Sequence, residues 1–312
     1  MFILFQRILR LSILFLFGGL VLAILLWVWL LGLHNTNRSV DLGLAFWMEH
    51  AWVESGARSV DTLAQKLQGL PVEDLYFHVG PLNEDGSLPQ NIFIPNLNIL
   101  PTQNYAWVGQ LRSKIDLDSP EVRAGVVQSS QWLIEQGFDG IHVNVEPVVH
   151  GDKGFFLLLK DLRVALPQAK LSVSIDEWQP HFGSLILGTL LDVNIQSYWS
   201  TAQVKKAARY VDQIVVMTYD TQFKDPRLYT WWVEFQTVAL SRRLPNGVSL
   251  RVGIPSYEQG AGIDPLAENI KTGKAGFERA LQNTRTDLSA LDGLAVYAYW
   301  ETSDDEWNLL FQ

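Results

Sequence analysis

The sequence contains no cysteine, which excludes disulfide bonds, cysteine-ligated zinc and a cysteine nucleophile. Its six histidines fall singly and never in the His-x-x-x-His spacing of a helical zinc site, so we expect neither a metal nor another cofactor. A Gly-x-Ser-x-Gly elbow, the commonest serine hydrolase signature, is also missing. No glycine-rich phosphate loop follows an early strand, which argues against a nucleotide-binding open sheet.

Basic residues are outnumbered in this chain of 312 residues, with 24 lysines and arginines against 33 aspartates and glutamates. Arg7 and Arg10 are the only charged residues before residue 34, and removing them leaves 22 basic against 33 acidic residues, a net charge of about −11. Such a charge repels nucleic acid, so we expect no nucleic-acid partner. With 48% hydrophobic residues and no low-complexity segment, the composition is that of a globular protein, which we expect to be a monomer.

A long segment without any charge runs from Leu11 to Leu33. At about 1.5 Å per helical residue it spans roughly 34 Å, enough for a hydrocarbon core of ~30 Å. We therefore predict a transmembrane helix within residues 1–33, joined by a short linker (34–41) to a globular domain (42–312). A cleavable signal peptide is the alternative, but its apolar core is usually shorter and ends in a small-x-small site, which Leu31 to His34 lack.

The flanking charges indicate an orientation for this segment. Arg7 and Arg10 precede it, whereas Arg38 and Asp41 offset each other just after it. The positive-inside bias then places the N-terminus in the cytoplasm and the globular domain outside, in the periplasm or on the surface of a bacterium.

Strand-like and helical segments alternate beyond the apolar run, which is typical of βα units around a parallel sheet. One helix is predicted from Ser119 as N-cap, with Pro120 in the first position, to a stop at Gly137. About eight candidate strands in a domain of this size predict a single (β/α)8 barrel. The predicted strands are Leu42–Trp47, Leu75–Val79, Tyr105–Leu111, a fourth ending at Glu146, Leu171–Ile175, Ile214–Met217, Ser249–Ile254 and Leu294–Tyr299.

The fourth predicted strand carries a row of polar side chains. A period of two places His142, Asn144 and Glu146 on one face, with apolar residues on the other. A half-exposed edge strand would explain the pattern, but the flanking sequence indicates burial on both faces. Barrel chemistry lies where strands end, and polar and aromatic residues gather at these ends. They are Glu49, His50, His78, Glu146, Asp176 to Trp178, Tyr219, Asp220, Tyr257, Glu258, Trp300 and Glu301.

Four segments, in order along the chain, carry a more specific pattern. The run Phe138 to Glu146 resembles the Asp-Gly-x-Asp-x-Asp-x-Glu signature of chitinase-type family 18 glycoside hydrolases. Val216 to Asp220 is similar to the Met-x-Tyr-Asp of that family, and Arg251 to Tyr257 to its strand-seven Gly-x-Pro-x-Tyr. Gly293 to Trp300 is similar to the strand-eight segment that closes on a tryptophan. The resemblance implies a (β/α)8 barrel that acts on N-acetylhexosamine-containing glycans.

The resemblance also implies roles for individual residues. Glu146 matches the general acid, and the substrate's own N-acetyl oxygen serves as nucleophile in such retaining enzymes. Tyr219 and Asp220 match contacts to the reacting sugar and its acetamido group, and Trp300 matches the floor of that subsite. The expected catalytic set is therefore Glu146, Asn144 and Tyr219, and the expected substrate-binding set is Asp139, His142, Asp220, Trp300, Tyr257, Trp47 and Glu301.

The sequence departs from the chitinase signature at two positions, where His142 and Asn144 replace its second and third aspartates. An Asn-x-Glu pair also resembles family 85 endo-β-N-acetylglucosaminidases, in which asparagine orients the acetamido group, and an amide oxygen can accept that hydrogen bond. A barrel that has lost an aspartate is, alternatively, a glycan-binding module with Glu146 as a ligand contact.

A further enzymatic alternative relates Asn144 to Pro147 to the Asn-Glu-Pro motif of paired-carboxylate glycosidases, with Glu258 as nucleophile. Val145 argues against it, because it separates two residues that are adjacent in that motif. For a domain anchored outside a bacterial membrane, a cell-envelope polysaccharide is the expected glycan substrate.

Overall fold

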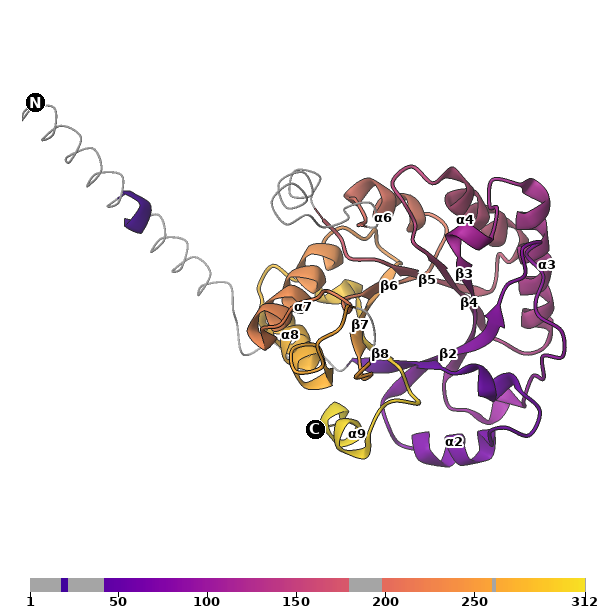
Figure 1. Cartoon of the computed structure of the whole chain (residues 1–312), viewed down its shortest axis with the longest axis horizontal. Helices are drawn as coiled ribbons and strands as arrows, with labels where there is room; N and C mark the ends of the chain where they lie inside the picture. Colours follow the sequence, from indigo (N-terminus) through magenta and orange to yellow (C-terminus); the bar gives the residue numbers. More distant parts are fainter. Residues whose placement is uncertain (1–17, 22–41, 180–197, 260–261, 312) are drawn as a thin grey trace, which may run out of the picture.

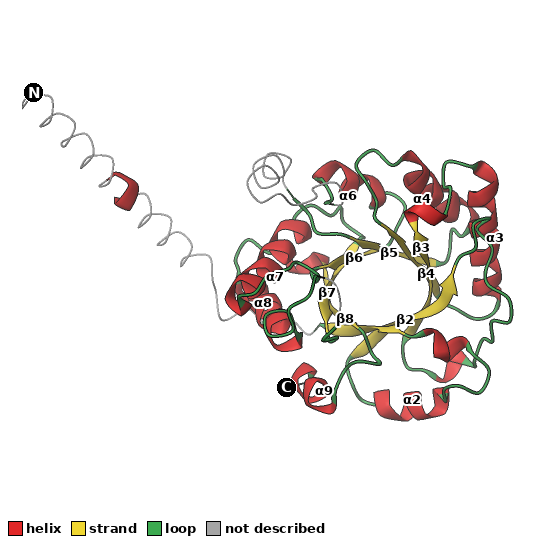
Figure 2. Ribbon diagram, in the orientation of Figure 1, coloured by secondary structure: helices red, strands yellow, loops and turns green. Residues whose placement is uncertain are grey.

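The computed structural model describes residues 18–21, 42–179, 198–259 and 262–311. Eight parallel strands close into a barrel in which each strand pairs with the next and β8 pairs with β1. Figure 1 looks into this ring of strands, with the helices arranged around its outside, and Figure 2 shows the same arrangement by secondary structure. The predicted (β/α)8 barrel is confirmed.

The strands follow the predicted order with small differences in their bounds. They are β1 (Gly43–Met48), β2 (Val72–Pro81), β3 (Gln103–Leu111), β4 (Gly140–Glu146), β5 (Lys170–Ile175), β6 (Gln213–Met217), β7 (Ser249–Pro255) and β8 (Leu291–Tyr297). The eighth strand ends two residues earlier than predicted. The reason is Ser256, whose hydroxyl accepts from the Ala298 backbone N–H and donates to the Ala298 carbonyl, so the chain leaves the sheet after Tyr297.

Helices surround the strands, and one of them, α3, is capped as the sequence predicts. The α-helices are α2 (Val60–Leu67), α3 (Pro120–Glu135), α4 (Lys153–Ala165), α6 (Thr201–Ala207), α7 (Pro226–Ser241), α8 (Ile270–Gln282) and α9 (Asp304–Leu310), and the short 3-10 helices are η1 (His50–Val53), η2 (Leu97–Ile99), η3 (Arg112–Lys114) and η5 (Leu288–Ala290). Ser119 caps α3 by accepting the Val122 N–H at 3.3 Å. Gly137 follows with φ of 107°, a conformation that ends helices and favours glycine.

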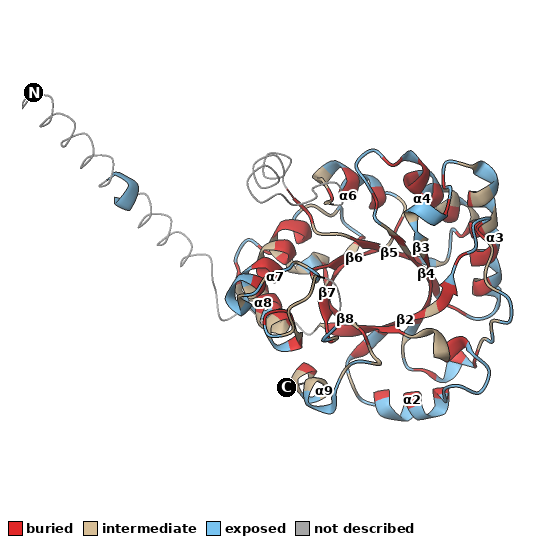
Figure 3. Cartoon of the chain, in the orientation of Figure 1, coloured by how far each residue is buried: buried red, intermediate tan, exposed pale blue. Residues whose placement is uncertain are grey.

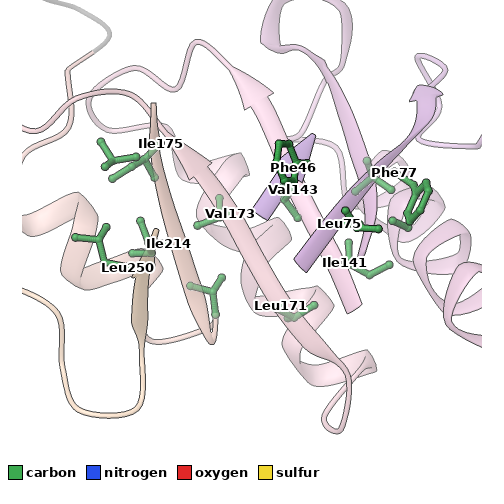
Figure 4. Packing of buried hydrophobic residues seen from close by; sticks show 14 of the residues in the cluster. Phe46, Leu75, Phe77, Ile141, Val143, Leu171, Val173, Ile175, Ile214 and Leu250 are labelled. Carbon is green, nitrogen blue, oxygen red and sulfur yellow. The ribbon is translucent and has the colours of Figure 1, made fainter. Parts of the chain in front are cut away.

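Apolar side chains fill two separate layers. Alternate strand residues such as Phe46, Leu75 and Val173 point outward and are fully buried in the layer shared with the surrounding helices. Figure 4 shows part of that layer, and Figure 3 shows that the strands are buried while the outer helix faces are exposed. The alternate residues fill the barrel interior, where the apolar cluster consists of Ala45, Trp47, Tyr76, Tyr105, Trp107, Val215 and Ala295.

Charged groups close the N-terminal end of the barrel. The buried Arg251 donates from Nε to Asp74 Oδ2 at 2.5 Å and from Nη2 to Glu73 at 2.8 Å. Gln213 donates to the same Asp74 oxygen at 2.9 Å. A polar cavity of about 630 Å³ adjoins these groups. Because Arg251 is paired there with Asp74 and Glu73, we assign this end to stability, which leaves the opposite end for chemistry.

Within the described residues no helix is long and apolar enough to cross a membrane. The predicted span from Leu11 to Leu33 lies outside the described residues apart from residues 18–21, and the predicted linker (34–41) lies outside them entirely. The anchor and its orientation therefore stay predictions.

Candidate active site

Glu146 is the last residue of β4 and stands at the C-terminal mouth of the barrel. Its register partner is Leu111, the last residue of β3. Burial raises the pKa of the Glu146 carboxyl above its ordinary value, and the nearby Asp220 carboxylate adds to this rise, while a hydrogen bond from Asn144 opposes it. A carboxyl in this environment keeps its proton to higher pH, as a general acid must.

Asn144 lies one layer deeper than Glu146 on the same interior face of β4. Its amide bonds to Glu146, yet its Oδ1 atom is buried and has no hydrogen-bond partner among the described residues. Its register partner is Gly109, where a Cβ would lie 2.5 Å from the Asn144 carbonyl oxygen and 3.2 Å from Trp107 Nε1. Glycine therefore lets β4 and the Trp107 indole approach each other, and the indole N–H is buried and unpartnered as well.

An aromatic cluster occupies the mouth beside Glu146, and Tyr297 is at its centre. The Tyr297 ring stacks on Tyr219 with centroids 5.6 Å apart and planes at 15°. Three other rings meet Tyr297 edge-on, at centroid distances of 5.7 Å for Trp47, 6.2 Å for Trp107 and 5.5 Å for Tyr257. Flat amphipathic rings of this kind suit the apolar faces of sugars.

Tyr219 and Asp220 follow β6, which lies two strands from β4 around the barrel. Burial and the Glu146 charge raise the pKa of Tyr219 well above its ordinary value, so its hydroxyl remains a hydrogen-bond donor. The Tyr257 hydroxyl donates to Asp220 Oδ1 at 2.6 Å, which orients that exposed carboxylate. Gly253 of β7 leaves the space that Trp47 and Tyr219 occupy, because a Cβ there would lie 3.1 Å and 3.3 Å from their rings.

Asp176 adds a third carboxyl to the mouth, after Glu146 and Asp220. It follows β5 directly and is partly buried. Burial and the neighbouring Glu146 charge raise the pKa of Asp176 to about 7. Although Asp176 stands at a predicted strand end, the expected site set leaves it out, because the sequence alone does not show which strand-end residues face Glu146.

His142 lies below Asn144 and is fully buried in the barrel interior. Trp47 Nε1 donates to its Nε2 at 3.1 Å, and its Nδ1 lies 2.9 Å from Ser172 Oγ. Tyr76 stacks on the ring with centroids 4.2 Å apart. Burial lowers the pKa of His142 to about 3, so the ring is neutral and accepts from the indole. It supports Trp47 from beneath, and the predicted substrate contact by His142 is corrected because the ring is covered.

Asp139 is placed away from the candidate site. It precedes β4, so the whole strand separates it from Glu146, roughly 20 Å at ~3.3 Å per residue. Its Oδ2 accepts the backbone N–H of Asn104 at 2.8 Å, which ties the starts of β3 and β4 together. The expectation that Asp139 binds substrate is therefore corrected: the residue has a structural contact at the N-terminal end of the barrel.

Trp300 and Glu301 lie beyond the end of β8 on the rim. Trp300 meets the Tyr297 ring edge-on at 5.6 Å and does not enter the central cluster. It lines a neighbouring cavity of about 450 Å³ together with Tyr299, Trp52, Arg58 and Glu49. Glu301 is exposed, though its charge raises the pKa of Tyr297 slightly, after burial and the Glu146 and Asp220 charges. Tyr297 thus lies in the ring cluster beside Glu146, where Trp300 was expected. Tyr297 stands in the same sequence segment, but it was not among the predicted site residues.

Two remaining expectations concern Glu258 and metals. Glu258 is exposed after β7, and in residues 42–179, 198–259 and 262–311 no group of three or more histidine or acidic side chains could hold a metal ion. Of the expected site residues, the structure brings together Glu146, Asn144, Tyr219, Asp220, Tyr257 and Trp47. The Trp47 ring is buried under Tyr219 and Tyr297, so its predicted contact with substrate is corrected to a supporting role.

Solved structures with this fold are chitinase-like barrels of glycoside hydrolase family 18. The C-terminal domain of a candidate chitinase from Desulfitobacterium hafniense aligns with a TM-score of 0.59 at 13% identity, over 87% of this chain and 98% of that one. The spore cortex-lytic enzyme SleL of Bacillus cereus aligns with a TM-score of 0.57 at 14% identity, over 88% and 75%. A chitinase-like agglutinin from Robinia pseudoacacia aligns with a TM-score of 0.51 at 13% identity, over 83% and 96%.

At these identities the likeness concerns the fold alone. No protein-family model matches the sequence, and no curated protein sequence matches it. The fold and the mouth together define a chitinase-like barrel that carries a protonatable glutamate, an amide and an aromatic cluster at its C-terminal end. This combination supports a protein that acts on glycans, as a hydrolase or as a binder.

Proposed function

We propose that this protein is a glycoside hydrolase that cleaves N-acetylhexosamine-containing glycans with retention of configuration. The observation that carries the proposal is the position of Glu146 at the end of β4, where burial and Asp220 raise its pKa, next to the unpartnered Oδ1 of Asn144. A glycosidase needs a proton donor beside the scissile oxygen, and a protonated glutamate at a barrel mouth supplies one.

Asn144 provides the second element of the reaction. Its free Oδ1 is an acceptor for the N–H of an acetamido group, and this hydrogen bond would hold the acetamido oxygen against the anomeric carbon. The substrate then supplies its own nucleophile, so no second protein carboxylate has to attack the sugar. Tyr297 offers a flat face for the sugar ring, the buried Trp47 ring supports it, and the Tyr219 hydroxyl offers a donor.

We also propose that residues 11–33 anchor the enzyme in a bacterial membrane with the barrel outside, so that its substrate is a cell-envelope polysaccharide. The charge-free run and the two arginines before it support this location. Protease added to intact cells should remove the barrel. Protection of the barrel, under conditions in which a known outside marker is digested, would reverse the proposed orientation.

A glycan-binding barrel without catalysis is the second candidate. It is favoured by the fold likeness to a chitinase-like agglutinin and by the amide at position 144 in place of an aspartate. In that case Glu146 and the aromatic cluster would bind the sugar and leave its glycosidic bond intact.

The two candidates are separated by assaying the full-length protein, in mild detergent, on chitooligosaccharides and on peptidoglycan. The hydrolase predicts release of products with the anomeric configuration of the substrate, followed by NMR. Glu146→Gln should lower kcat by about 10²- to 10⁴-fold, since the acid is lost while shape is kept.

Equal turnover by wild type and Glu146→Gln would remove Glu146 as the acid, and inverted products would exclude the substrate-assisted route. Glycan binding by calorimetry without any turnover would establish the second candidate.

A further inference from the structure

Asp176 and Glu146 stand beside each other on neighbouring strands. β4 and β5 pair in register from Gly140 with Lys170 to Val143 with Val173. Continuing this register by three residues aligns Glu146 with Asp176. Neighbouring strands lie about 4.8 Å apart, so the two carboxyls are close when both face the same side.

Both carboxyls do face the barrel interior. On β5 the alternate residues Ser172 and Ser174 contact His142, from Oγ to Nδ1 and to Nε2 respectively, at 2.9 Å each. His142 is itself an interior residue of β4, two positions before Asn144 and four before Glu146. The period of two therefore carries Asp176 to the interior face, at the level of Glu146.

The charges around the pair are negative. Asp220 after β6 acts on Glu146, and Glu177 interacts with Asp176, whose charge raises the pKa of Glu177. The tyrosines that face the pair are Tyr219, Tyr297 and Tyr198. No arginine, lysine or histidine of the described chain shifts the pKa of either carboxyl. Two carboxylates side by side without a cation repel each other, so ionising both is unfavourable and one proton is retained.

We propose that Glu146 and Asp176 form a carboxyl pair that shares one proton, and that Asp176 is the positioning residue that retains this proton beside Glu146, which passes it to the glycosidic oxygen. The inference rests on the proposed hydrolase function and deepens it. Asp176, just after β5, then supplies the acidic group that is absent at position 144, where the side chain is the amide of Asn144.

The steps balance with one proton. In the first step the Glu146 O–H bond breaks and the proton goes to the leaving oxygen, while the acetamido oxygen bonds to the anomeric carbon. Both carboxylates are then ionised and face the cationic oxazolinium, which their charges stabilise. In the second step water attacks the anomeric carbon and the bond between this carbon and the acetamido oxygen breaks, with its electron pair returning to that oxygen. A proton of the water goes to Glu146, and the pair regains its single proton.

Asp176→Asn removes the charge and keeps the size of the side chain, and Glu177→Gln is the matched control. Glu177 is the next residue; burial and the Asp176 charge raise its pKa, and it does not act on Glu146. In Asp176→Asn the alkaline limb of the pH profile of kcat/KM should move to lower pH by about one unit. At pH values above the limb, kcat/KM should then be about tenfold lower than in wild type. In Glu177→Gln the limb should stay at the wild-type position. Coincident limbs in wild type and Asp176→Asn would overturn the proposal, because a purely structural role lowers activity without moving the limb.

A second measurement separates this pair from the hydrolase proposal itself. Full-length protein labelled with ¹³C at glutamate side-chain carboxyls, with Glu146→Gln for assignment, reports the Glu146 titration without substrate. The pH midpoint of the Glu146 titration should be lower in Asp176→Asn than in wild type, and it should be unchanged in Glu177→Gln. If wild type cleaves no glycan but the midpoint falls, the pair stands and only the hydrolase fails; an unchanged midpoint overturns the pair whether or not the protein is active.

Discussion

At the scale of single residues, Tyr297 is the strand-eight ring at the centre of the cluster beside Glu146, whereas the sequence predicts Trp300. The predicted eighth strand continues to Tyr299, so the tryptophan just after it stands at the expected strand end. The observed strand stops at Tyr297, because Ser256 binds the Ala298 backbone. That contact joins residues far apart in sequence, so no local pattern reveals it.

The two rings give a direct test of this placement. Tyr297→Ala should lower kcat/KM by about tenfold or more, since the variant loses a ring stacked on Tyr219 beside the reacting sugar. Trp300→Ala should mainly raise KM for longer oligosaccharides, because Trp300 lines the neighbouring cavity. Steady-state kinetics on a series of chain lengths distinguish the two, and an equal loss in both variants would contradict the central position of Tyr297.

Asn144 carries a second test at this scale. Asn144→Ala removes the acceptor for the acetamido N–H. We expect kcat/KM to fall by about tenfold to a hundredfold, because this is the effect of losing one hydrogen bond to a group that develops charge. Asn144→Asp keeps an acceptor oxygen and should retain much more activity than the alanine variant. Kinetics at several pH values measure both, and unaltered kcat/KM in Asn144→Ala would exclude the amide from the reaction.

At the scale of elements, the sequence predicts local features well and neighbours in space poorly. The cap at Ser119, the glycine at the end of α3 and the alternation along β4 are local, and all three are observed. Asp139 is part of the sequence signature, but only the structure of β4 shows that Asp139 and Glu146 lie at opposite ends of the barrel. The position of Asp176 beside Glu146 depends on the register between strands, which the sequence does not state.

The N-terminal end of the barrel supplies a prediction about β7 and β2. Burial disfavours the charged guanidinium of Arg251, yet Asp74 and its other acidic neighbours outweigh this and raise its pKa. Arg251→Met would leave Asp74 buried without its cation, so the free energy of unfolding should fall by about 3–5 kcal/mol. Urea unfolding measures it, and the double variant with Asp74→Asn should lose less than the sum of the two single variants. Additive losses would show that the two side chains do not depend on each other.

At the scale of the whole molecule, buried titratable groups set how stability depends on pH. Burial raises the pKa of Asp176 to about 7, of Glu177 to about 8 and of Glu268 to about 7. Burial lowers the pKa of His142 to about 3 and of His78 to about 4. Below pH 6.5 the histidines and the carboxyls have opposite effects on the free energy of unfolding as pH changes. The unfolded chain takes up protons on the histidines, whereas the folded chain holds protons on the carboxyls.

Above pH 6.5 only the carboxyls remain. Their folded pKa values exceed the unfolded values near 4, so the folded state binds more protons and the free energy of unfolding must fall as pH rises. From pH 6.5 to 8 we expect a loss of about 2 kcal/mol, seen as a melting temperature lower by about 5 °C. The triple variant Asp176→Asn, Glu177→Gln, Glu268→Gln should remove most of this dependence, and the raised carboxyls Glu146 and Asp220 account for what remains. A melting temperature that is constant from pH 6.5 to 8 in wild type would mean that these carboxyls are ionised in the folded protein, which would also remove the retained proton on which Glu146 and Asp176 depend.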